Sequence, residues 1–294
     1  MKKENFSSKM SLAGAMVVFG TIGLFVRNIA MPSSVIAFIR GLVGALFLML
    51  FCLITRKKFS FSAVKEKLLL LCLSGAAIGV NWIFLFEAYR YTTVATATLC
   101  YYMAPIFVIV MSSLIYKEKL TAKKICCTLI ALVGMVFVSG VAETGVGNIE
   151  EMKGVILGVL AAVFYSSVVL MNKSLGSVPA YDKTIVQLMG AGVVILPYCL
   201  ATVSVSDVSL DKKSVIMLLI VSIVHTGIAY TAYFGSMKNL QSQTIAIMSY
   251  IDPIVAVVLS ALVLKETMSL LSIAGAVMIL TATFLSEVNL RKKQ

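Results

Sequence analysis

Long apolar runs, separated by short polar stretches, extend along the chain from beginning to end. A helix that crosses the hydrocarbon core of a bilayer needs about 20 predominantly apolar residues. Ten runs approach that length, and none shows the alternating polarity of a membrane β-strand. The pattern predicts an all-α integral membrane protein with ten transmembrane helices, at about residues 10–30, 34–55, 68–89, 93–115, 125–141, 154–172, 184–204, 214–235, 243–264 and 268–287.

Two of these runs carry the same sequence pattern. Residues 101–118 read YYMAPIFVIVMSSLIYKE and residues 249–266 read SYIDPIVAVVLSALVLKE; at an offset of 148 they agree at eight of 18 positions. Each half of the chain holds five predicted spans, an odd number, so the second half enters the membrane in the opposite direction. The chain is therefore predicted to form two inverted five-helix repeats, over residues 10–141 and 154–287, an arrangement typical of alternating-access carriers. The register includes the pairs Tyr102/Tyr250, Pro105/Pro253, Ser112/Ser260, Lys117/Lys265 and Glu118/Glu266.

Composition and charge support a membrane protein and set its orientation. The chain is 60% hydrophobic and 13% charged, whereas a soluble domain is about half apolar and a quarter charged. The net charge of +12 does not indicate nucleic acid as a partner, because the basic residues lie mainly between the apolar runs. With the N-terminus inside, the inner segments carry 18 lysines and arginines and the outer segments carry five. This asymmetry predicts a multi-pass protein of the inner (plasma) membrane with both termini cytoplasmic.

The order of these features resembles the drug/metabolite transporter superfamily, in its EamA-like ten-helix branch. The resemblance covers residues 10–287 and rests on two five-span halves, a proline within the fourth and ninth spans, and a glutamate at the end of each. It also rests on an arginine in the second span and a glycine after the second glutamate. The residues are Pro105, Pro253, Glu118, Glu266, Arg40 and Gly275, while Cys127 departs from the pattern at the position that matches Gly275.

The resemblance implies a secondary carrier of small metabolites, commonly an exporter, that is not an enzyme and has no nucleotide-binding domain. It implies a central cavity lined by spans one, three, four, six, eight and nine, with spans five and ten at the periphery. Small multidrug relatives exchange protons for cations through a glutamate in their first span. The first span of this chain has no acidic residue, so their mechanism does not transfer to it.

Two ionisable residues lie near the middle of predicted spans, where a charge costs about 2.5–3.5 kcal/mol on insertion scales. Asp252 is about eight residues into the ninth span, roughly 12 Å deep, and Pro253 after it leaves the carbonyl of Ser249 without its helical partner. His225 is the only histidine, in the middle of the eighth span. Both are candidates for substrate binding and for proton coupling. The alternatives are an acid that is neutral or paired with Lys238, and a packing histidine.

Arg40 lies about 9 Å below the outer surface by helical rise. We expect it to anchor a substrate carboxylate, with a structural ion pair as the alternative. Arg27 and Arg90 stand at the outer ends of spans, where long side chains snorkel, and Arg90 is three residues after Glu87. The position of the glutamates that end spans four and nine suggests gating or helix-end pairing, not substrate capture, and we expect the structural role.

Aromatic and amide side chains complete the predicted substrate site. Tyrosines that lie away from span ends do not form interfacial belts, and their faces suit a cation or an aromatic ring. Packing between helices is the alternative for any single one. The predicted substrate-binding residues are Arg40, Asn81, Trp82, Tyr102, Tyr165, His225, Tyr230, Tyr250 and Asp252; Tyr101 and Tyr233 share the same aromatic pattern, and Pro105 and Pro253 are predicted helix hinges.

Together these features predict a secondary active transporter of amino acids or related zwitterions that works by alternating access. A quaternary amine or multidrug carrier of the same fold is the alternative, and an intramembrane enzyme or a non-transporting scaffold is more remote. The six cysteines lie in apolar runs without CxxC spacing, so no metal or cofactor is expected. The expected partners are a small polar metabolite and the lipid bilayer, and a homodimer is left open.

Overall fold

The computed structural model describes residues 6–116, 121–138, 142, 149–237, 240, 248–249 and 251–287, and these residues form helices and no β-strand. The all-α prediction is therefore confirmed for this part of the chain. The elements are α1 (Phe6–Gly20), α2 (Ile22–Arg27), α3 (Ser33–Ile54), α4 (Phe61–Glu66), α5 (Leu68–Tyr91), α6 (Val94–Tyr101), α7 (Ala104–Tyr116), α8 (Ala122–Val138), α10 (Ile149–Ser174), α11 (Ala180–Thr202), η1 (Val205–Asp207), α12 (Lys212–Ile220), η2 (Val221–Ile228), α13 (Ala229–Met237), α15 (Ile251–Leu262) and α16 (Leu270–Glu287).

Many of these helices are long and apolar enough to cross a membrane. Seven helical stretches among the described residues meet that condition, and each coincides with a predicted span. Three shorter apolar helices, Ile125–Val138, Ile251–Leu262 and Leu270–Ala282, lie within the other three predicted spans. The chain is thus a multi-pass helical membrane protein, and the count of ten spans stays a prediction.

Three of the spans are interrupted helices. The first breaks at Thr21 between α1 and α2, and the fourth breaks at Tyr102 and Met103 between α6 and α7, just ahead of Pro105. In the eighth, the π-helix η2 separates α12 from α13. Backbone groups released from regular helix bonding at membrane depth are tolerated where protein or a cavity satisfies them. The interruptions therefore mark where a site can be built.

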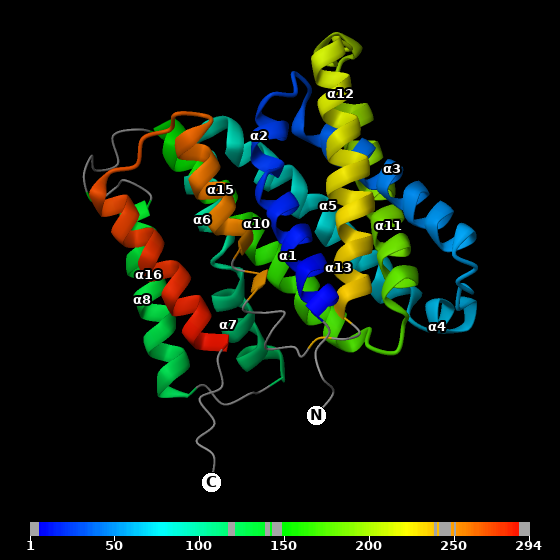
Figure 1. The fold of residues 1–294 in the computed structure, drawn as a ribbon, viewed down its shortest axis with the longest axis horizontal. Coiled ribbons are helices and arrows are strands. Elements are labelled where there is room, and N and C mark those ends of the chain that lie inside the picture. Colours follow the sequence, from blue (N-terminus) through cyan, green and yellow to red (C-terminus); the bar gives the residue numbers. More distant parts are fainter. Residues whose placement is uncertain are drawn as a thin grey trace.

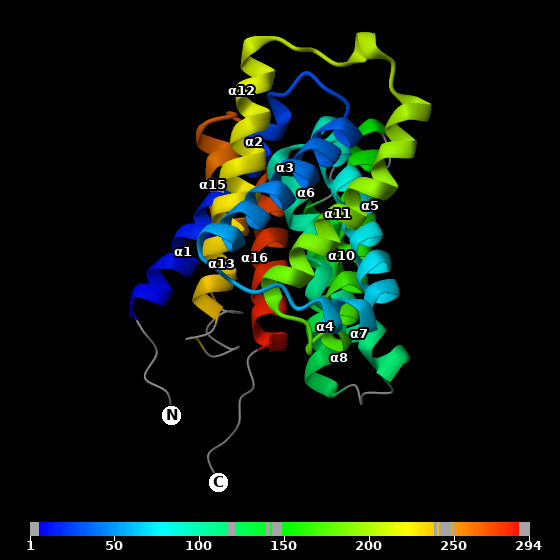
Figure 2. The ribbon, with the colours of Figure 1, turned by 90° about the vertical axis from the view of Figure 1, so that its right-hand side faces the viewer.

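The helices form one elongated bundle. Figure 1 shows the start of α1 and the end of α16 at the same, lower end, and the start of α12 at the opposite end. Figure 2 shows the connection from α11 to α12, which contains η1, crossing the upper end, whereas α4 lies at the lower end. We name the upper end the outer end, after the predicted orientation. Helix α5 runs through the middle of the bundle and packs against α3, α10 and α11.

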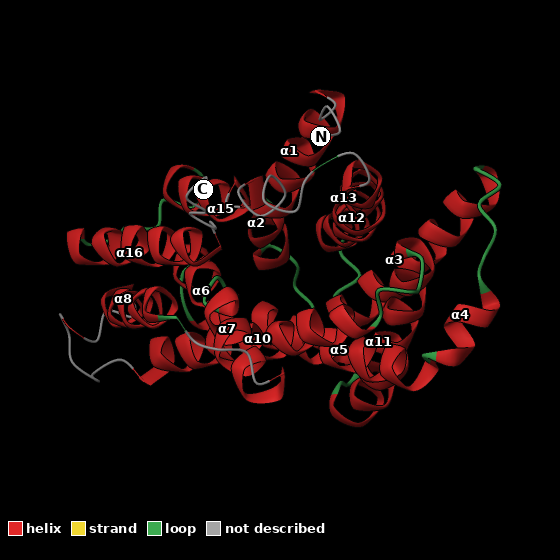
Figure 3. Cartoon of the chain, turned by 90° about the horizontal axis from the view of Figure 1, so that it is seen from below, coloured by secondary structure: helices red, strands yellow, loops and turns green. Residues whose placement is uncertain are grey.

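Helices α8 and α16, the fifth and tenth spans, lie side by side at one edge of the bundle (Figure 3). Two glycines allow this contact, because a Cβ atom on Gly275 would lie 2.5 Å from the carbonyl oxygen of Gly134. The close approach gives the glycine of the family pattern a packing role. Its contact partner is Gly134, about two helix turns after Cys127.

Candidate functional site

Arg40 is buried in the middle of the bundle without a carboxylate partner among the described residues. Its Nε donates a 2.7 Å hydrogen bond to the Thr226 hydroxyl, and its guanidinium carbon lies 4.3 Å from the centroid of the Trp82 ring and 5.5 Å from that of Phe86. Aromatic faces stabilise a cation that has left water. In the described part of the chain, Nε carries the only hydrogen bond of this guanidinium, so its two terminal nitrogens remain to bind an anion.

The π-helix η2 presents two side chains to this region. A π-helix bonds five residues back and is frequent at functional sites. Accordingly, the Thr226 hydroxyl donates to the carbonyl of Val221 at 3.2 Å, and the His225 Nδ1 lies 3.4 Å from the carbonyl of Ile220. On its other side, the His225 Nε2 lies 2.9 Å from the Thr21 hydroxyl at the break in span one. The interruptions of spans one and eight therefore meet at a histidine.

Asp252 meets Tyr102 where span four is broken. The Tyr102 hydroxyl donates a 2.7 Å hydrogen bond to the Asp252 carboxylate and lies 3.3 Å from the carbonyl oxygen of Ser249. Ser249 is four residues before Pro253, so its carbonyl is the one that proline leaves without a helical donor. The Tyr102 hydroxyl thus partly replaces the backbone N–H that a residue other than proline would donate to this carbonyl. Asp252 has no cationic partner among the described residues.

Several tyrosines lie near Arg40 and Asp252. Tyr101 and Tyr89 each lie close enough to both charged residues to interact with them electrostatically. The Tyr101 ring centroid is 5.4 Å from that of Tyr165 and 6.1 Å from that of Tyr102. Tyr230 interacts with Arg40 and packs edge-on to Phe19 at 5.5 Å. The site therefore joins an arginine and an aspartate that share tyrosine neighbours.

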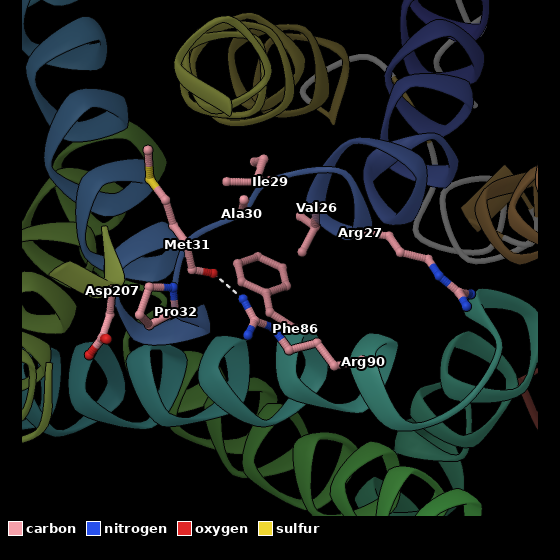
Figure 4. A pocket seen from close by; sticks show the side chains of 9 residues that line it. All are labelled: Val26, Arg27, Ile29, Ala30, Met31, Pro32, Phe86, Arg90 and Asp207. Atoms are coloured by element: carbon pink, nitrogen blue, oxygen red, sulfur yellow. Dashed lines mark hydrogen bonds between the residues drawn. The ribbon is translucent and has the colours of Figure 1, made fainter. Parts of the chain in front are cut away.

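A cavity of about 540 Å³ opens at the outer end, above Arg40. Figure 4 shows Phe86 in its floor and the side chains of Arg27 and Arg90 along one wall, with Asp207 on the far side. Arg90 donates to the carbonyl of Met31 and lies 3.9 Å from the carboxylate of Glu87, as the spacing of the two residues predicted. Phe86 touches both this cavity and the Arg40 region, so it separates them.

The predicted site residues differ in how the structure uses them. Arg40 and Trp82 stack, His225 lies beside Arg40, and Tyr102 joins Asp252. Asn81 is buried and donates to the carbonyl of Ala161 at 2.6 Å, which links α5 to α10. Tyr165 is 40% exposed. Tyr250, together with Glu118 and Lys238, lies outside the described residues.

Sequence reasoning missed three residues of this region: Thr21, Tyr89 and Thr226. Thr226 adjoins His225, and Thr21 stands between two glycines in FGTIG, a polar interruption of an apolar run that could have marked it. Arg27 was expected to snorkel, but it instead pairs with Glu266. Pro105 and Pro253 lie at the second and third residues of α7 and α15, and their role as hinges stays a prediction.

Comparison with known proteins identifies the family. Residues 8–140 and 152–287 each match the EamA-like transporter family. The uncharacterized transporter YxxF of Bacillus subtilis is 31% identical over 294 residues, covering 99% of this chain and 93% of that protein. A probable amino-acid metabolite efflux pump of Salmonella typhimurium is 22% identical over 249 residues, covering 80% of this chain and 82% of that one. A solved crystal structure shares the fold with a TM-score of 0.67 at 19% identity, over 95% of this chain and 96% of the other. The chain belongs to the EamA-like transporter family.

Proposed function

We propose that this transporter carries amino acids or related zwitterions, by alternating access of two inverted halves and in the direction of export. The observation that carries the proposal is the pair of opposite charges inside the bundle, Arg40 and Asp252, which have no ionic partner among the described residues and share the neighbours Tyr89 and Tyr101. A zwitterion can offer its carboxylate to Arg40 and its ammonium group to Asp252. Export is supported by the name of the Salmonella relative.

The chemistry of each end follows from its neighbours. A guanidinium with free terminal nitrogens binds a carboxylate through two parallel hydrogen bonds, and the apolar surroundings strengthen that contact. A carboxylate beside several tyrosine faces suits an ammonium group, which both the charge and the ring quadrupoles attract. The region thus offers one group to the carboxylate and one to the ammonium of a zwitterion.

Proton coupling is the second part of the proposal, with Asp252 and His225 as the groups that exchange protons. A protonated Asp252 no longer attracts an ammonium group, so proton uptake releases the substrate. His225 sits between the Thr21 hydroxyl and the Ile220 carbonyl. The carbonyl only accepts, so Nδ1 carries a proton toward it, whereas Nε2 can either accept from the hydroxyl or, when protonated, donate to it.

A thermal-shift assay of the detergent-purified protein tests the substrate proposal. A ligand that binds only the folded state adds about 2.7 kcal/mol of stability at 100 times its Kd. We expect an amino acid to raise the melting temperature and the response to vanish in Arg40→Gln and in Asp252→Asn. Arg56→Gln, a substitution of an exposed arginine just after the end of α3, is the matched control and keeps the response. An amino-acid response that survives in Arg40→Gln contradicts the proposal.

A quaternary amine carrier is the second candidate, favoured by the cluster of Tyr101, Tyr102 and Tyr165 close to Asp252. In that case Trp82 and Thr226 hold Arg40 for structural reasons. Choline in the same assay separates the two. A response to choline that persists in Arg40→Gln, without any response to amino acids, selects the amine carrier.

A further inference from the structure

Glu266 follows α15 at the outer end and joins three spans that are far apart in the sequence. Its carboxylate pairs with Arg27 at the end of α2 and accepts a 3.0 Å hydrogen bond from the backbone N–H of Val94, the first residue of α6. It also accepts a hydrogen bond from the Ser260 hydroxyl of α15. The Glu266 side chain is 7% exposed and that of Arg27 is 39% exposed. One acid therefore links spans one, four and nine.

The backbone just before and at Glu266 has an unusual conformation. Lys265, directly before it, has a φ angle of 54°, in the left-handed region that non-glycine residues seldom adopt. The N–H of Glu266 then bonds back to the carbonyl of Ser260 at 3.2 Å. Strained backbone of this kind persists where the surrounding contacts determine it and gathers at functional sites. The ion pair and hydrogen bonds of Glu266 are surrounding contacts of this kind.

The three linked elements also pack tightly beneath Glu266. A Cβ atom on Gly23 of α2 would lie 2.3 Å from a methyl of Val94 in α6. On α15, Ala256 and Ser260 lie on one buried face, and Asp252 stands one turn below Ala256. We call this junction of α2, α6 and α15 the outer seam. A path from Asp252 to the outer side along these helices crosses the outer seam.

We propose that Glu266 and Arg27 form the outer latch of the transport cycle. They hold the outer seam together while the outer path is closed, and their separation opens it toward Asp252. The latch rests on the alternating access that we propose above, but not on the identity of the substrate. The ion pair of Glu87 and Arg90 lies at the same end within α5 and does not take part in the outer seam.

Cysteine labelling tests the latch without a substrate. Ala256 is 3% exposed, so in an Ala256→Cys variant a membrane-impermeant maleimide added from the outside should react slowly. Glu266→Gln or Arg27→Gln should each accelerate this labelling on the order of tenfold, because either substitution removes the ion pair that holds the outer seam closed. Combining both substitutions should accelerate it no further, because the pair is already lost in either single variant. Glu87→Gln is the matched control and should leave the rate unchanged.

Proteins without the cysteine at position 256 give the background from the native cysteines, and the melting temperature of each variant shows that it is folded. Unchanged labelling in both Glu266→Gln and Arg27→Gln overturns the latch, as does equal acceleration by Glu87→Gln. Should Glu266→Gln not fold, Arg27→Gln decides alone, since its side chain is partly exposed. An absent response to amino acids would refute the proposed substrate and leave the labelling result intact.

Discussion

Each charged residue inside this protein is stabilised by a different set of neighbours. Arg40 has two aromatic faces and one hydroxyl, Asp252 has a tyrosine, and Glu266 has an arginine and a backbone N–H. A charge in the membrane is costly, and residues that retain one are functional candidates by default. The incomplete neutralisation of Arg40 and Asp252 by described residues separates them from Glu266, which has an ionic partner. This difference is the reason that we propose substrate contact for the first two and closure for the third.

Thr226 tests how Arg40 is held. Thr226→Val keeps the shape that packs against Gly44 but removes the acceptor of the Arg40 Nε hydrogen bond. A hydrogen bond to a charged group contributes about 1.5–3 kcal/mol, so we expect a loss of stability of that order, measured by thermal unfolding in detergent. Thr231→Val, which removes only a bond to the carbonyl of Gly227 in the same span, is the control. Equal losses in both variants would show that Thr226 does not hold Arg40.

At the scale of elements, interrupted helices place the site, and the sequence predicted only some of the interruptions. The break ahead of Pro105 follows from a missing N–H, a local property that a single sequence reveals. The π-helix Val221–Ile228 contains no proline. The side chains of His225 and Thr226 bond to the carbonyls five residues before them and also meet Thr21 and Arg40. Such contacts between distant segments leave no local pattern. The same holds for the pairing of Arg27 with Glu266.

The contact of α8 with α16 gives a prediction at this scale. In Gly275→Ala, the added methyl meets the backbone oxygen of Gly134, which cannot rotate away, so the two helices must separate. We expect a destabilisation of about 1–3 kcal/mol, as overpacking typically costs, measured as a lower melting temperature. Gly14→Ala in α1 is the control, because a Cβ there meets nothing within 4 Å. Similar melting temperatures for Gly275→Ala and the unaltered protein would refute the packing role of this glycine.

For the whole molecule, the apolar runs and the distribution of lysine and arginine predicted more than any single residue did. Bilayer thickness fixes how long a spanning helix must be, so the seven longest helices were readable from the sequence. Span nine was harder, because only Ile251–Leu262 of its predicted range is a long described helix. The predicted inversion of the two halves follows from the odd number of spans predicted for each half, and it stays a prediction about topology.

Lys58 and Ser206 test the inversion directly, because they are 148 residues apart, the offset of the repeat, and both are exposed. Lys58 precedes α4, and Ser206 lies in η1, at opposite ends of the bundle in Figure 2. In inverted halves, matching positions face opposite sides of the membrane. We expect an impermeant maleimide to label Ser206→Cys in intact cells and to reach Lys58→Cys only after the cells are opened, above the background of the native cysteines. Labelling of both positions from the outside would mean that the chain does not cross the membrane an odd number of times between them. In that case the halves would be parallel, and alternating access by exchange of two inverted halves would lose its structural basis.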